Sequence, residues 1–94
     1  IYDFSLYNHL EYIDLSNNHI KFVRNYYFKS NSKLSFILLS NNNIFYIEDD
    51  SFSFKGTFNS LDLSYNQLEN LSYNIFKESH FSNFNVRNNK LKVI

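Results

Sequence analysis

Cysteine is absent from the 94-residue chain, and glycine occurs once, at Gly56. Without cysteine there is neither a disulfide nor a thiolate metal site, and the redox compartment stays open. A single glycine excludes a phosphate-binding loop, because such a loop needs several glycines to bring its backbone close to the phosphates. These two absences exclude cysteine-based metal centres and glycine-rich nucleotide sites.

An excess of charge of one sign is also missing, since nine Lys and Arg side chains balance nine Asp and Glu side chains. No net charge therefore favours a nucleic acid or an anionic membrane as a partner. The longest apolar runs, "FILL" and "IFYI", have four residues. A membrane helix needs roughly 20, so we expect no direct membrane insertion by this segment.

One 11-residue pattern recurs four times along the chain. The copies read "LEYIDLSNNHI" from Leu10, "LSFILLSNNNI" from Leu34, "FNSLDLSYNQL" from Phe58 and "FSNFNVRNNKL" from Phe81. Two steps of 24 residues and one step of 23 separate their starts. A fixed period in this range indicates a repeat protein, in which each copy is stabilised by packing on its neighbours.

The copies share the template L-x-x-L-x-L-x-x-N-x-L. Alternation within x-L-x-L-x points two side chains inward from a short strand, and neighbouring copies can pair as a parallel sheet. An asparagine after the strand can accept from N–H groups and donate to C=O groups where the chain turns. The position before it is expected to need only a polar residue. We predict a structural ladder of four stacked asparagines: Asn18, Asn42, Asn66 and Asn89.

This template resembles that of the leucine-rich repeat family, and the match covers nearly the whole chain. The resemblance implies an α/β-type leucine-rich repeat solenoid, with a short parallel β-sheet on the concave face and irregular or 3₁₀ segments on the convex face. The 24-residue repeat with a phenylalanine in its return segment resembles the typical subclass of the family, which occurs in Toll-like receptor and Slit-like ectodomains. These phenylalanines are Phe28, Phe52 and Phe76, with Phe4 in the same register before the first copy.

The return segments depart from the family pattern at one position. The family often has another leucine three residues after the phenylalanine, where this chain carries Asn31, Lys55 and Ser79. We therefore expect a thin or looped convex layer. Tyr26 and Phe54 lie near these positions, and with Tyr27 they could supply the missing apolar surface.

The repeats are expected to form a single fragment, residues 1–94, of a larger leucine-rich repeat domain. Its four repeat strands start near residues 10, 34, 58 and 81. Segments that would cap the terminal repeats are not visible in the sequence. The chain begins without a methionine, a basic segment or a long apolar segment, so a signal peptide is missing or lies upstream.

Catalytic and metal-binding patterns are not apparent. His9, His19 and His80 fall at different template positions and lack metal-ligand spacing. The acidic run at residues 48–50 lacks the spaced oxygen ligands of a calcium loop. Serines recur at the seventh template position, but no His–Asp arrangement accompanies them. We therefore expect no enzymatic activity, no metal and no cofactor.

Outward side chains of the predicted sheet are the candidate partner-binding site. Strands about 4.8 Å apart would place Tyr12 beside Phe36, and Leu38 between two aspartates, which makes an aromatic patch with acidic flanks. Arg87 brings positive charge to the far end, and aromatic and Arg side chains are enriched among binding hot spots. The complete predicted site is Tyr12, Asp14, Phe36, Leu38, Asp62, Tyr65 and Arg87.

Two functional hypotheses remain open. In the first, the repeats are a protein-binding module of an extracellular receptor or adhesion protein, and a protein ligand or co-receptor contacts the concave sheet. In the second, they are spacer coils, and the ligand binds elsewhere in the parent chain. The cell surface is the expected location, with the cytoplasm as the alternative. Fold alone does not supply the partner.

End-to-end association or poor solubility is expected of the isolated chain, because a repeat end without a cap exposes apolar residues. Phe4 and Leu6 would be exposed at one end, and Leu91, Val93 and Ile94 at the other. Sedimentation velocity of the purified chain tests this expectation. A dilute solution that sediments as a monomer would contradict it.

N-glycosylation is expected at Asn70 if the protein is secreted in a eukaryote, because "NLS" from Asn70 to Ser72 is the chain's one N-x-S/T acceptor. After secretory expression, glycosidase treatment should lower the mass of the chain. An unchanged mass would remove this support for an extracellular location.

Overall fold

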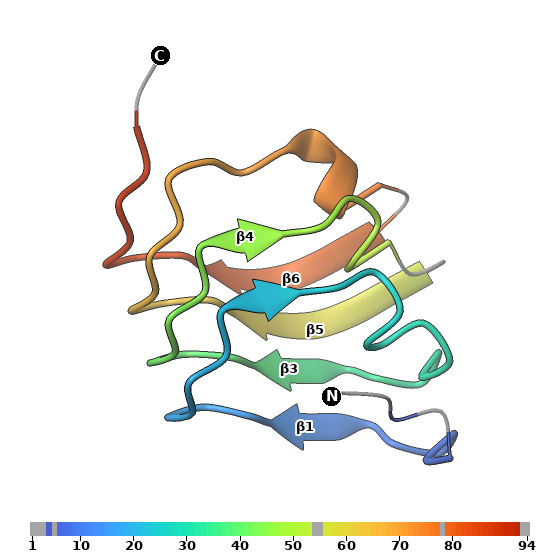
Figure 1. Cartoon of the computed structure of the whole chain (residues 1–94). Helices are drawn as coiled ribbons and strands as arrows, with labels where there is room; N and C mark the ends of the chain where they lie inside the picture. The colour runs from blue at the N-terminus through green and yellow to red at the C-terminus, as the bar shows by residue number, and fades with distance from the viewer. Residues whose placement is uncertain (1–3, 5, 54–55, 78, 93–94) are drawn as a thin grey trace.

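The computed structural model describes residues 4, 6–53, 56–77 and 79–92. A four-stranded parallel sheet forms one layer, with strand order β1-β3-β5-β6, and a two-stranded parallel sheet, β2-β4, forms a second layer across from it (Figure 1). The predicted parallel sheet is thus confirmed. The strands are β1 (Tyr12–Asp14), β2 (Phe22–Val23), β3 (Phe36–Leu38), β4 (Tyr46–Ile47), β5 (Gly56–Asp62) and β6 (Ser79–Asn85).

The register of the larger sheet follows the repeat. Ile13 pairs with Ile37, Ile37 with Leu61, and Leu61 with Phe84. These inward side chains fill the space between the two sheets together with Val23 and Ile47 of the smaller sheet. The core is therefore shared between repeats, as expected for a solenoid whose single repeats cannot fold alone.

Phenylalanines of the return segments form a stacked column. The ring centroids of Phe4 and Phe28 lie 6.0 Å apart, as do those of Phe28 and Phe52. Phe28 and Phe52 are fully buried, whereas Phe4 at the end of the column is half-buried. Leu6 is 90% exposed. Of the other terminal residues predicted to be exposed, Leu91 is exposed, and Val93 and Ile94 lie outside the described residues.

Asparagine side chains satisfy the backbone where each coil leaves the sheet. The Asn66 Nδ2 donates to the carbonyl oxygens of Leu39 (3.0 Å), Leu63 (3.0 Å) and Ser64 (3.1 Å). Its Oδ1 accepts from the backbone N–H of Ile44 (3.0 Å). Asn66 thus binds both its own turn and the preceding repeat. Equivalent bonds are made by Asn42 and Asn89, and Asn18 donates within its own repeat.

The position before each of these asparagines has a backbone role that the sequence prediction missed. In all four repeats the backbone of the residue at this position lies in the left-handed region. The residues are Asn17 (φ 59°), Asn41 (φ 55°), Tyr65 (φ 56°) and Asn88 (φ 57°). Among residues other than glycine, asparagine tolerates this region best. The expectation that this position needs only polarity is therefore wrong, because the turn also constrains its backbone.

The convex side is more regular than predicted. It contains the expected short 3₁₀ turn, η1 (Tyr73–Ile75), but also the β2–β4 ladder, in which Phe22 pairs with Tyr46 and Val23 with Ile47. Each of these short strands has one exposed and one buried residue.

Polar side chains also bind neighbouring repeats at the position where the family often has leucine. Asn31 is 1% exposed. Its Nδ2 donates to the carbonyl oxygens of Phe4 (2.9 Å) and Tyr7 (3.0 Å). The Ser79 hydroxyl donates to the Phe52 carbonyl oxygen. Each of these two side chains therefore donates to the backbone carbonyl of the return-segment phenylalanine in the preceding repeat. Of the nearby tyrosines, Tyr27 packs on the core and Tyr26 is exposed, and Lys55 and Phe54 lie outside the described residues.

The substitution Asn66→Ala should lower the free energy of unfolding by about 2–4 kcal/mol, because it leaves buried backbone groups of two repeats without partners. Urea denaturation measures this change. Asn43→Ala is the matched control, since Asn43 is exposed, and it should change stability by no more than about 0.5 kcal/mol. Equal effects of the two substitutions would contradict the structural role of the ladder.

Candidate functional site

An aromatic pair lies at the start of the first two sheet strands. Tyr12 of β1 pairs in register with Phe36 of β3, and their ring centroids are 5.6 Å apart at an interplanar angle of 41°. Tyr12 is 55% exposed and Phe36 is half-buried. The pair presents apolar surface on the outward face of the sheet. Packing of the core, which lies on the inward face, does not require this surface.

Leu38 lies between two aspartates, two residues further along the strands. It pairs with Asp14 of β1 on one side and Asp62 of β5 on the other. Leu38 and Asp62 are half-buried, and Asp14 is exposed. Repeat stacking therefore brings five of the predicted site residues onto one stretch of the sheet: Tyr12, Asp14, Phe36, Leu38 and Asp62.

Hydrogen bonds within each repeat fix the two carboxylates. The Asp14 Oδ1 accepts from the Ser16 N–H (2.9 Å), and the Asp62 Oδ1 accepts from the Ser64 N–H (2.9 Å) and hydroxyl (2.6 Å). Bonds from the side chain of Ser16, and then from its backbone N–H, lower the pKa of Asp14 below its usual value. Asp14 is therefore ionised at neutral pH.

In the other three repeats, the side chain at the template position of Leu38 accepts a hydrogen bond that Leu38 cannot accept. Asp14, Asp62 and Asn85 each accept from the N–H two residues later, the last of these at 3.1 Å from Arg87. A leucine side chain cannot accept this bond. The turn therefore gives no reason for an apolar side chain at residue 38.

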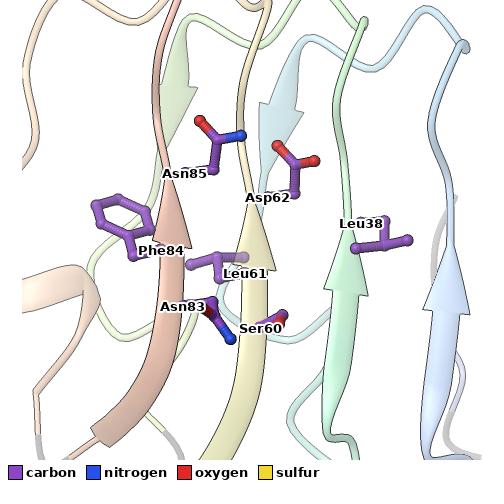
Figure 2. A pocket seen from close by; sticks show the side chains of 7 residues that line it. All are labelled: Leu38, Ser60, Leu61, Asp62, Asn83, Phe84 and Asn85. Carbon is purple, nitrogen blue, oxygen red and sulfur yellow. The ribbon is translucent and has the colours of Figure 1, made fainter.

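A shallow depression of about 370 Å³ continues from Leu38 across β5 and β6 (Figure 2). Its rim is polar: the Asn83 Nδ2 donates to the Asn59 Oδ1 (3.3 Å), and Asn85 lies beside Asp62. The sequence prediction left the amide side chains out of the site. The lining residues are Leu38, Ser60, Leu61, Asp62, Asn83, Phe84 and Asn85.

Tyr65 and Arg87 form a separate cluster where the chain turns out of the sheet. The Arg87 guanidinium carbon lies 5.8 Å from the centroid of the Tyr65 ring, a cation–π contact. Tyr65 borders a second depression of about 480 Å³, which also contacts Asn41, Asn88 and Lys90. The predicted site is therefore divided into an aromatic and acidic part on the strands and a basic and aromatic part at the turns.

A second exposed aromatic group lies on the smaller sheet and was not predicted. The Phe22 and Phe45 rings meet edge to face at 5.2 Å, and the Arg24 guanidinium carbon lies 4.7 Å from the Phe22 centroid. Phe45 and Tyr46 are 53% and 47% exposed. Phe22 and Tyr46 are 24 residues apart and each lies two residues after the closing template position, so the repeat spacing could have found them.

No group of three or more His, Cys, Asp or Glu side chains within residues 4, 6–53, 56–77 and 79–92 could hold a metal ion. Within those same residues, no helix has the length and apolar character that a membrane crossing requires.

The leucine-rich repeat family model matches residues 8–68, which is more than half of the chain. The chain belongs to the leucine-rich repeat family. Leucine-rich repeats are protein-interaction modules, and the family is typically non-enzymatic. No curated protein and no solved structure matches the chain.

Proposed function

We propose that the concave sheet of this protein-interaction module binds a protein partner through the aromatic pair and the Asp14–Leu38–Asp62 row. The observation that carries the proposal is Leu38, a half-buried apolar side chain with no role in its own turn and a carboxylate on each side. Tyr12 and Phe36 extend this apolar surface. A contiguous apolar patch with a polar rim is typical of protein interfaces.

We also propose that the repeats belong to an extracellular receptor or adhesion protein, and that the partner is a protein ligand or co-receptor. The family module is common in extracellular proteins. Asn70 of the glycosylation acceptor is exposed, which is compatible with a glycan on the folded chain. The competing hypothesis is that these repeats are spacers and that the ligand binds elsewhere in the parent chain.

The double substitution Phe36→Ser and Leu38→Ser should reduce partner affinity by about tenfold or more, because it removes aromatic and aliphatic anchors from the centre of the proposed interface. The fold should persist, because the inward Ile37 and Leu39, 0% and 1% exposed, are unchanged. Affinity is measured with a protein captured by the unmodified parent protein, and circular dichroism checks the fold.

Tyr73→Ser is the matched control, because Tyr73 is an aromatic residue that is 77% exposed in the 3₁₀ turn, away from the sheet. This control should bind as the unmodified protein does. Unchanged binding by the double variant would contradict the concave-face proposal and favour the spacer hypothesis.

A further inference from the structure

We propose, on the basis of the concave-face function above, that the partner is a protein segment that places a Lys or Arg side chain over Leu38 and an apolar side chain against Tyr12 and Phe36. The charge of the row, the fixed carboxylates and the spacing along the strands support this choice of partner.

Acidic groups dominate the outward face of β1, β3 and β5. Asp14 and Asp62 are the charged side chains among the alternate outward residues of the sheet register in these strands. Within the described part of the chain neither carboxylate forms an ion pair; the ion pair found there joins Lys92 to Glu69. A basic partner side chain would gain attraction from both aspartates, whereas an acidic one would be repelled.

The carboxylates are already oriented before a partner arrives. The Oδ1 atom of each one is fixed by a serine two residues later, so that the Oδ2 is the oxygen left for a partner. Fixing these groups in the free protein lowers the entropic cost of binding. Since one aspartate lies on each neighbouring strand, a cation above Leu38 would lie midway between the two carboxylate-bearing strands, each about 5 Å to the side in the plane of the sheet.

Lys and Arg have the shape that this row requires. Their aliphatic stems cover apolar surface while the charged group stays near polar partners. The stem would contact Leu38, and the charged group would bind a free carboxylate oxygen. A purely apolar residue would leave the carboxylates without a partner, and a short polar residue would not cover Leu38.

The aromatic pair fixes the second feature of the partner. Tyr12 and Phe36 precede Asp14 and Leu38 by two residues in their strands, which corresponds to about 7 Å along the sheet. In an extended segment, alternate side chains are the same distance apart and point to the same side. We therefore expect a basic and an apolar residue at positions i and i+2 of an extended partner segment.

A phage-displayed library of random linear peptides provides the probe. The chain is immobilised at low density, so that copies do not meet, and peptides are selected for binding to it, which does not require the natural partner to be identified. Enriched peptides should carry Lys or Arg two residues from an aromatic or aliphatic residue. Their affinity should fall as salt is raised, and by about tenfold or more in the double variant Asp14→Asn and Asp62→Asn.

The double variant Asp49→Asn and Asp50→Asn is the matched control, because it removes the same charge from two exposed residues of the convex return segment. It should leave peptide affinity within about twofold of the unmodified chain.

Enriched peptides without a basic residue, or affinity unchanged in Asp14→Asn with Asp62→Asn, would overturn the basic-partner proposal. If such peptides still lose affinity in the Phe36→Ser and Leu38→Ser variant, the concave-face function stands and only the partner chemistry is wrong. If no peptide is enriched, or if the serine variant binds enriched peptides unchanged, both proposals fail.

Discussion

Unpaired backbone groups at the exit of each strand are the constraint on which the rest of this structure depends. A chain that leaves a buried sheet exposes N–H and C=O groups that need partners. Asn66 provides them with one side chain, and its bonds reach Leu39 and Ile44 in the preceding repeat as well as its own turn. The same amide group thus closes the turn and fixes the distance and register between repeats.

Because register is fixed in this way, side chains at equal template positions lie in rows across the sheet. The inward rows form the shared core, and their chemistry is constrained by packing. The outward rows carry no such constraint. Asp14, Leu38, Asp62 and Asn85 form one outward row, so its chemistry can differ from repeat to repeat without loss of the core.

The repeat spacing was sufficient to predict the parallel sheet, its register and the neighbours of Leu38, because a fixed period places equal positions side by side. It did not predict features set by contacts between return segments. Asn31 occupies a position where the family often has leucine, and its bond to the Phe4 carbonyl depends on the preceding repeat. The left-handed backbone at Tyr65 was missed for another reason: a tyrosine gives no sequence signal for positive φ.

Leu38 bears on the binding proposal because the one structural explanation for it, repulsion between like charges, accounts for only part of the choice of residue. A third aspartate in the row would place like charges on adjacent strands, which is unfavourable; this explains why residue 38 is not acidic. It does not explain why the residue is apolar, since an asparagine would be neutral and would also accept the turn bond, as Asn85 does. Leucine gives up that bond and leaves apolar surface beside the Tyr12–Phe36 pair. The aliphatic stem of the Lys or Arg side chain proposed above would supply the contact that charge repulsion and the turn bond leave unexplained.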